Sequence, residues 1–277
     1  MSTQPEIAVS GLGLFSARPA RVEVRQSSGA SGIRFFHSST SHVVPALISH
    51  LQPARGPLGG RNTVIGDDVF SVATVEHLLS ALAGMGLWHA DIVIDADELP
   101  ILDGSAAEFV KMLHGSAFRA PAAQEIRLTQ TVRVDDASSG AWIEARPSIR
   151  LRYRYELRYP AGAGIPEQHY EWDGDPLRYA SEIAPARTFS LEREALAMKA
   201  AGLFPHLTPR DMLVIAPDGR AIENSFRFPD EPARHKLLDL IGDLALLGGP
   251  LIAEVTAHKS SHALTHELCR RIAALQP

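Results

Sequence analysis

The order of the predicted secondary structure repeats once along the chain, and this repetition restricts the fold more than any other feature of the sequence. In the first half, short strands precede two helices with a strand between them, at residues 22–24, 32–36, 74–87, 90–97 and 103–113. In the second half, strands and helices follow at residues 126–136, 141–147, 149–160, 190–201, 235–247 and 251–258, before a closing helix. Alternating apolar residues indicate the strands, and apolar residues at helical spacing indicate the helices. We therefore expect an α+β fold with two halves of similar element order.

A segment without periodicity separates the two halves. Residues 116–124, SAFRAPAAQ, are mostly small residues with one proline, as is typical of a connecting loop. We predict an N-terminal α+β domain at 1–120, which contains an adjacent Glu-His pair. The predicted C-terminal α+β domain at 121–277 contains a His-x3-Asp helix and a histidine at the entry to the last helix.

Composition narrows the class of partner. The chain has 277 residues, of which 45% are hydrophobic, enough for a substantial core. The formal net charge is -5, and no run of five like charges occurs, so we expect no binding to nucleic acid and a small molecule as the partner. No apolar stretch approaches the roughly 18 residues of a membrane span, and we expect a cytoplasmic protein without stable membrane insertion. No extended apolar surface pattern demands a dimer, so a monomer is expected.

The single cysteine, Cys269, restricts the chemistry of any metal site. One cysteine allows neither an intramolecular disulfide nor a cysteine-rich zinc site, so a bound metal must use histidine and carboxylate ligands. The predicted helix at 235–247 offers such groups, because His235, Asp239 and Asp243 follow one another at steps of four. At 3.6 residues per turn they lie within about 80° of one another, and a histidine and a carboxylate four residues apart can reach one cation. The alternative is that these residues form only the polar stripe of an amphipathic helix. Taken alone, their spacing favours this alternative.

Other candidate groups are weaker taken one by one. Glu76 and His77 begin a predicted helix with Thr74 as its N-cap, and they offer a general base beside a metal ligand; an acidic helix start is the alternative. His262 lies at the entry to the last helix, a location that suits a catalytic residue, and a capping or surface histidine is the alternative. Thr188 and Phe189 precede the helix at 190–201, where an N-cap and a core aromatic are the alternatives.

Five segments in order resemble one family. TVEHLLSAL, ILDGSAAEFV, ARTFS, RHKLLDLIGDL and HKSSHAL are similar to the signature of the UDP-3-O-acyl-N-acetylglucosamine deacetylases of lipid A synthesis, over roughly Val9 to Ala274. The resemblance implies two similar domains, each a β-sheet layer packed on helices, with the active site in the interdomain cleft. It implies hydrolysis of the N-acetyl group of a UDP-linked 3-O-acyl-N-acetylglucosamine, which releases acetate.

The same resemblance assigns roles to individual residues. It implies a Zn²⁺ cofactor bound by His77, His235 and Asp239, with a water in the open position of a catalytic zinc. The remaining implied roles are Glu76 as general base, Thr188 as a donor to the oxyanion, His262 as general acid, Asp243 as the partner that keeps His262 charged, Lys236 and Lys259 near the nucleotide diphosphate, and Phe189 in substrate binding.

The chain departs from the family pattern at several places. Phe15 and Ala17 stand where the family has histidine and glycine, and Ser261 and Thr265 stand where it has glycine and asparagine. The loop from Phe204 to Val214 is bulky and stiffened by proline where the family lines the passage for the acyl chain, so a narrowed passage is expected.

Two alternatives follow from these departures. One is a divergent zinc deacetylase of a non-acylated N-acetyl sugar. The other is a sugar-nucleotide-binding homologue without activity, although such a protein has no need of both a base and an acid. The metal also stays open, because histidine and aspartate ligands suit Fe²⁺ as well as Zn²⁺.

Overall fold

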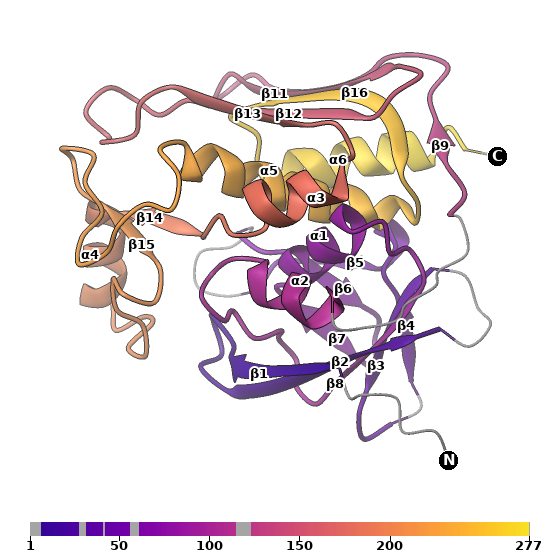
Figure 1. Ribbon diagram of the computed structural model, residues 1–277, viewed down its shortest axis with the longest axis horizontal. Coiled ribbons are helices and arrows are strands. Elements are labelled where there is room, and N and C mark those ends of the chain that lie inside the picture. Colours follow the sequence, from indigo (N-terminus) through magenta and orange to yellow (C-terminus); the bar gives the residue numbers. More distant parts are fainter. Residues whose placement is uncertain (1–6, 28–31, 41, 56–60, 115–122, 277) are drawn as a thin grey trace.

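Two β-sheets enclose two layers of helices (Figure 1). The computed structural model describes residues 7–27, 32–40, 42–55, 61–114 and 123–276. The predicted α+β class is therefore confirmed. The predicted domain boundary near residue 120 falls outside the described residues, and the division at that point stays a prediction.

The first sheet comes from the N-terminal half. Its five strands lie in the order β1-β2-β8-β3-β4, with β3 and β8 parallel and the other neighbours antiparallel. The strands are β1 (Ala8–Leu12), β2 (Pro19–Gln26), β3 (Ile33–His37), β4 (Val43–Pro45) and β8 (Ala90–Ile94). A smaller sheet contains β5 (Leu51–Gln52), β6 (Val64–Gly66) and β7 (Ser71–Ala73), after the 3-10 turn Ile48–His50. Helices α1 (Glu76–Gly84) and α2 (Ala107–His114) cover the inner face of the first sheet.

The second sheet comes from the C-terminal half. Its main path is β10-β11-β16-β12-β13, with β12 parallel to β16, and the short β9 also pairs with β16. These strands are β9 (Ile126–Arg127), β10 (Val132–Asp136), β11 (Ala141–Pro147), β12 (Arg152–Leu157), β13 (Gln168–Trp172) and β16 (Leu251–His258). Helices α5 (Glu231–Leu244) and α6 (His262–Ala273) lie under this sheet, with the 3-10 turn Ala245–Leu247 after α5 and the short helices Pro176–Arg178 (α3) and Tyr179–Ile183 beside it.

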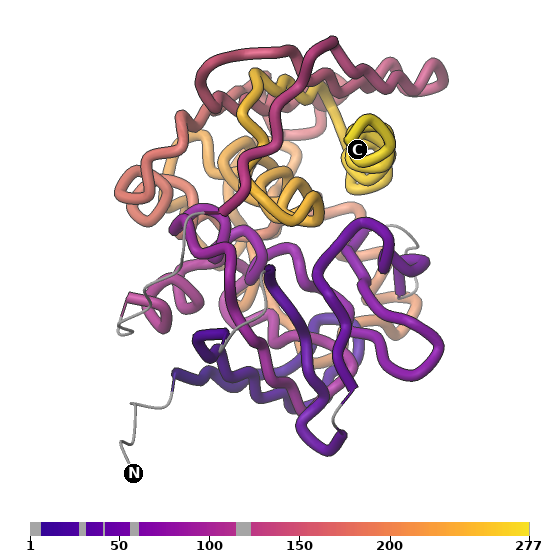
Figure 2. The backbone as a smooth tube through the Cα atoms, turned by 90° about the vertical axis from the view of Figure 1, so that its right-hand side faces the viewer, coloured from indigo at the N-terminus to yellow at the C-terminus, as the bar shows by residue number. Residues whose placement is uncertain are grey.

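The two halves meet where α1 packs on α5. Figure 2 shows the orange-to-yellow segment that contains α5 and α6 between the second sheet and the indigo-to-magenta first half. The two helices approach one another closely at Gly242, where an added Cβ would lie 2.1 Å from the backbone oxygen of Glu76. Any side chain there would collide with backbone, which cannot move aside as a flexible side chain can. Gly242 thus sets how closely the two helices lie, and Glu76 begins one of them.

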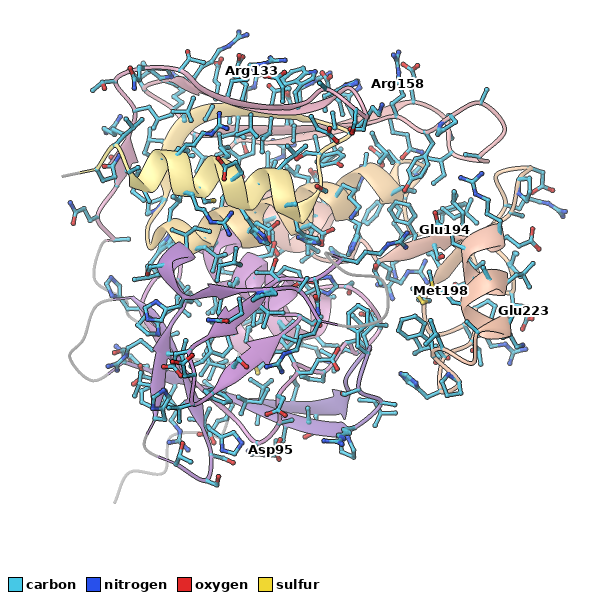
Figure 3. All side chains as sticks on the ribbon, turned by 180° about the vertical axis from the view of Figure 1, so that it is seen from behind. Asp95, Arg133, Arg158, Glu194, Met198 and Glu223 are labelled. Atoms are coloured by element: carbon cyan, nitrogen blue, oxygen red, sulfur yellow. The ribbon has the colours of Figure 1, made fainter. Side chains whose placement is uncertain are left out.

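A small segment projects from the side of these layers. Strands β14 (Phe189–Leu191) and β15 (Leu213–Ile215) pair in parallel, and α4 (Glu192–Ala200) connects with them without burying any residue. Figure 3 shows Glu194, Met198 and Glu223 together in this segment. It contacts the first half through Arg61 and Glu194, 3.2 Å apart, and through the rings of Phe15 and Phe204, whose centroids are 5.6 Å apart.

Two helix starts differ from the sequence prediction. The helix predicted at 235–247 begins a turn earlier, because Pro232 in its first turn supplies the fixed φ that a helix start accepts. Thr74 is not the N-cap of α1: it has a φ of 61°, and its hydroxyl donates to Glu98 at 3.2 Å. Within the described residues, none of the helices has both the length and the apolar character that crossing a membrane requires.

Candidate active site

The predicted site residues converge where α1, α5 and α6 meet. Glu76 and His77 lie in the first turn of α1, His235, Asp239 and Asp243 follow one another along α5, and His262 begins α6. All six side chains belong to buried residues. Burying so many ionisable groups is costly unless they pair with one another or bind a metal. The arrangement therefore indicates a functional cluster rather than a solvated polar stripe.

His77, His235 and Asp239 form a group with the spacing of metal ligands. Oδ1 of Asp239 lies 3.6 Å from Nε2 of His77 and 3.4 Å from Nε2 of His235. Two ligand atoms that share a tetrahedral zinc ion at 2.0–2.1 Å are separated by about 3.3–3.4 Å. Both distances are long for a hydrogen bond but close to that separation. The donor set therefore fits a tetrahedral cation.

The backbone orients one of these ligands. Nδ1 of His235 lies 3.1 Å from the carbonyl oxygen of Ala186, which can only accept, so Nδ1 carries the proton. Burial lowers the pKa of His235 to about 3, and the ring is neutral at pH 7. The lone pair at Nε2 then faces Asp239. The Ala186 carbonyl at Nδ1 is the kind of outer partner that a metal-ligating histidine commonly has.

Lys236 lies beside the same aspartate. Its Nζ donates to Oδ2 of Asp239 at 2.8 Å. Burial opposes the ionisation of Asp239, but the charge of Lys236 and the neighbouring histidines together outweigh burial and hold the pKa of the Asp239 carboxyl well below its usual range. Asp239 is therefore a carboxylate at neutral pH, as a metal ligand must be. Lys259, the other predicted phosphate contact, donates from Nζ to the backbone oxygen of Ser139 at 2.5 Å.

Glu76 is a buried carboxyl with an altered acidity. Its Oε2 accepts a hydrogen bond from the backbone N–H of Thr63 at 3.0 Å. Burial raises the pKa of Glu76 above its usual value, although the charges of His262 and His77 oppose this. A carboxyl whose pKa is raised toward the working pH is suited to accept a proton during a reaction and to release it afterwards.

His262 and Asp243 form the opposite side of the cluster. Nδ1 of His262 donates to Oδ2 of Asp243 at 2.7 Å, while Nε2 of the same ring lies 3.9 Å from Oδ2 of Asp239. Burial lowers the pKa of His262, but the Asp243 and Asp239 carboxylates outweigh burial and raise it to about 9. The ring is therefore charged at neutral pH, with a proton at Nε2 that faces the proposed metal ligands.

Thr188 and Phe189 follow closely on Ala186, the residue whose carbonyl contacts His235. The backbone N–H of Thr188 donates to Gly104 at 2.7 Å, and Gly104 has a φ of 81°, which explains the glycine of the DGS motif. The ring of Phe189 lies edge-on to that of His235, with centroids 6.4 Å apart. Both residues are half-buried, and Phe189 lies beside one of the candidate metal ligands.

A buried ion pair holds the chain segment that leads to Thr188. Arg187 donates from its backbone N–H and its Nε to Oε1 of Glu231, at 3.0 and 2.9 Å. The guanidinium also donates to Asn224 and to the carbonyl of Ser225. This pair fixes the backbone on both sides, including the Ala186 carbonyl that orients His235.

Two residues of the cluster, Thr63 and His266, were not predicted from the sequence. The hydroxyl of Thr63 donates to Oδ1 of Asp243 at 2.6 Å, and Nε2 of His266 lies 3.0 Å from that hydroxyl oxygen and 3.3 Å from Oδ1 of Asp243. The spacing of His262 and His266 at four residues on one helix was a usable signal for the second histidine. Thr63 lies in a segment without a recognisable pattern, and no local signal marked it.

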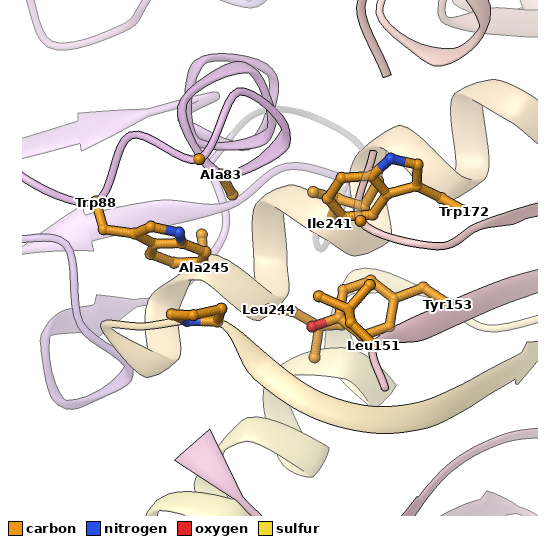
Figure 4. Close-up of a pocket in the computed structure, with 11 residues that line it drawn as sticks. Ala83, Trp88, Leu151, Tyr153, Trp172, Ile241, Leu244 and Ala245 are labelled. Atoms are coloured by element: carbon orange, nitrogen blue, oxygen red, sulfur yellow. The ribbon is translucent and has the colours of Figure 1, made fainter. Parts of the chain in front are cut away.

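Two cavities lie against α5. The larger, of about 180 Å³, is lined by apolar residues such as Trp88, Trp172, Ile241 and Leu244, and none of the proposed site residues lines it (Figure 4). The smaller, of about 10 Å³, is lined by polar groups that include Lys236, Asp239 and His262. That volume is about what one water needs. Neither cavity is lined by the loop at 204–214, and Phe204 of that loop contacts Phe15.

Known proteins resemble this chain over nearly its whole length. The family model for UDP-3-O-acyl N-acetylglycosamine deacetylase matches residues 2–274. The UDP-3-O-acyl-N-acetylglucosamine deacetylase of Oleidesulfovibrio alaskensis is 37% identical, with 96% of this chain and 86% of the relative covered. The proteins of the same name from Trichormus variabilis and Nautilia profundicola are 35% and 32% identical, covering 97% and 95% of this chain and 96% and 88% of those relatives.

Proposed function

The chain belongs to the UDP-3-O-acyl-N-acetylglucosamine deacetylase family, and from this premise we propose that it hydrolyses the N-acetyl group of its UDP-sugar substrate at a zinc ion held by His77, His235 and Asp239. It is an enzyme of lipid A synthesis, and its products are acetate and a free glucosamine amine. The observation that carries the zinc proposal is the spacing of three buried donor atoms around one point.

The residues present fit zinc better than an oxygen-loving cation. Two imidazoles and one carboxylate are ligands typical of a catalytic zinc with an open position, whereas Mg²⁺ and Ca²⁺ take oxygen ligands. When bound, zinc acts as a Lewis acid that polarises the acetamide carbonyl and acidifies water at the site. We propose that the site lies between the two halves, since its ligands come from α1 and α5.

The side chains around the proposed ligands supply the proton transfers. We propose that the Glu76 carboxylate takes a proton from the water that attacks the acetamide carbon. His262 carries protons on both ring nitrogens, and it donates the one at Nε2 to the leaving nitrogen while Nδ1–H stays bound to Asp243. The Thr188 hydroxyl is the proposed donor to the carbonyl oxygen as negative charge develops there.

Substrate recognition is proposed from the charged and aromatic groups at the rim. The Lys236 ammonium, already held by Asp239, and the Lys259 ammonium supply positive charge for the diphosphate. Phe189, beside His235, offers an apolar surface to the sugar or its acyl chain. The high coverage by relatives named for the acylated substrate favours that substrate over the non-acylated alternative.

A substrate comparison tests the proposal. Purified protein loaded with one equivalent of zinc is assayed with UDP-3-O-acyl-N-acetylglucosamine and with UDP-N-acetylglucosamine, and acetate release is measured. We expect turnover of the acylated compound only, with loss of activity after chelation and recovery with zinc. Equal turnover of both compounds would reject the acylated substrate, and full activity after exhaustive chelation would reject the metal.

A further inference from the structure

A single buried threonine touches both sides of the proposed proton-transfer machinery. Thr63 precedes β6 in the first half and is fully buried. Its backbone N–H donates to Oε2 of Glu76 at 3.0 Å, and its backbone oxygen accepts from the N–H of Val75 at 3.3 Å. Its hydroxyl, at the other end of the residue, donates to Oδ1 of Asp243 at 2.6 Å.

The proton positions in this network follow from what each group can donate. A hydroxyl has one proton, and an ionised carboxylate only accepts. Because Thr63 uses its proton toward Asp243, the 3.0 Å contact with His266 requires Nε2–H of His266 to donate to the hydroxyl oxygen. The same N–H reaches Oδ1 of Asp243 at 3.3 Å. Oδ1 is thus held by Thr63 and His266, and Oδ2 by His262.

The network also explains a second cluster of potential metal ligands. Asp243, His262 and His266 offer ligand atoms close to one another. The Thr63 hydroxyl oxygen lies 3.5 Å from Nδ1 of His262 as well as within hydrogen-bond distance of the other two residues. The space that a cation would need among these side chains is therefore filled by a hydroxyl. The cluster is a hydrogen-bond network rather than a metal site.

We propose that Thr63 and His266 are positioning residues that fix the Asp243 carboxylate, and with it His262, relative to Glu76. This inference rests on the proposed function, because it gives Glu76 and His262 their roles as base and acid. The terminal torsion of an aspartate is broad when nothing restrains it. With Oδ1 held by two donors, the carboxylate plane is fixed, and the Nε2 end of His262 keeps its direction.

Near-isosteric substitutions test the proposal. Thr63→Val removes the hydroxyl and Thr63→Ser keeps it, while His266→Met removes the donor and His266→Gln places an amide N–H near the former Nε2. We expect kcat to fall about 10- to 100-fold in Thr63→Val and His266→Met, because a misdirected acid loses part of the roughly 10²- to 10⁴-fold that general acid–base catalysis contributes. The KM and the bound zinc should change less than about twofold, because neither residue touches the substrate or a zinc ligand. Thr63→Ser and His266→Gln should recover most of kcat.

A matched control separates positioning from loss of a buried hydroxyl. Thr265 is also buried, and its hydroxyl donates to the backbone oxygen of Ser261 at 3.2 Å rather than to Asp243. Thr265→Val should lower thermal stability about as much as Thr63→Val and change kcat far less. Wild-type kcat in Thr63→Val, or a Thr63→Ser variant no better than Thr63→Val, would overturn the proposal.

A further variant distinguishes failure of this inference from failure of the proposed function. If Glu76→Gln loses activity while Thr63→Val and His266→Met do not, the positioning role is wrong and the base stands. If Glu76→Gln keeps its kcat, the base assignment is wrong. In that case the comparison of Thr63→Val with Thr63→Ser still decides whether the hydroxyl controls Asp243 and His262.

Discussion

Nδ1 of His262 donates to Oδ2 of Asp243 across 2.7 Å, and both side chains are buried. In such surroundings the interaction between opposite charges is stronger than at the surface. Burial lowers the pKa of His262, but the Asp243 carboxylate, together with Asp239, outweighs burial and raises the pKa of that imidazole to about 9. The protonation of His262, and the activity that depends on it, should therefore depend on Asp243, which lies in α5.

Asp243→Asn should shift the pH dependence of kcat/KM on its alkaline side. A histidine whose pKa is raised keeps its proton fully at pH values below its usual pKa and loses it as the pH rises through the raised value. The asparagine amide has no charge to favour the imidazolium, so the alkaline limb should move to lower pH, by about one unit or more. Initial rates between pH 5 and pH 10 measure the shift. An unmoved alkaline limb would show that His262 is not the acid.

Metal binding and proton transfer should separate by substitution. Glu76→Gln removes the carboxylate but none of the proposed ligands, so it should bind zinc like the wild type and lose about 10²- to 10⁴-fold in kcat. His235→Ala should lose bound zinc. Metal analysis after gel filtration, together with steady-state kinetics, measures both effects. A Glu76→Gln variant without zinc, or a His235→Ala variant with it, would contradict the assignment.

The Arg187–Glu231 pair should dominate the stability of the segment beside the site. Arg187→Met leaves the Glu231 carboxylate buried without its partner, and we expect the free energy of unfolding to fall by about 3–5 kcal/mol. The exposed pair Arg210–Glu223 offers a control, and Arg210→Met should change stability little. Denaturant unfolding of both variants measures the difference. Similar losses in the two variants would mean that burial of the pair is of no consequence.

Gly242→Ala should destabilise the protein although alanine favours helices. The added methyl group collides with the backbone oxygen of Glu76, and overpacking of this kind costs about 1–3 kcal/mol or more. Gly86→Ala is the comparison, because Gly86 has open space around it and only a positive φ of 73° to oppose the substitution. Thermal unfolding should rank Gly242→Ala as the less stable variant. The reverse order would mean that α1 and α5 can move apart at little cost.

The sequence predicted those parts of the site whose residues recur at regular spacing along one element. His235, Asp239 and Asp243 share a side of α5 because their spacing follows the helical period, and His262 was placed correctly at the start of α6. The fold class followed from the order of strands and helices. These features depend on local periodicity, which a single sequence carries.

Contacts between distant segments could not be predicted in the same way. Thr63 bonds to Asp243 across 180 positions and to His266 across 203 positions, and no local pattern encodes either contact. Thr74 looked like a helix cap, but its hydroxyl donates to Glu98 instead, and its backbone has a left-handed φ of 61°. Such tertiary contacts override the tendencies of single residues.

The acceptor that orients His235 is the backbone carbonyl of Ala186, and every amino acid has one. A substitution at position 186 can crowd its surroundings, but it cannot delete that oxygen. A point mutation at position 186 therefore cannot remove this contact of the proposed metal ligand His235. A comparison of side chains among related sequences does not reveal the contact either. The position of this oxygen depends instead on the residues that fix the path of the main chain, among them Arg187 and Glu231.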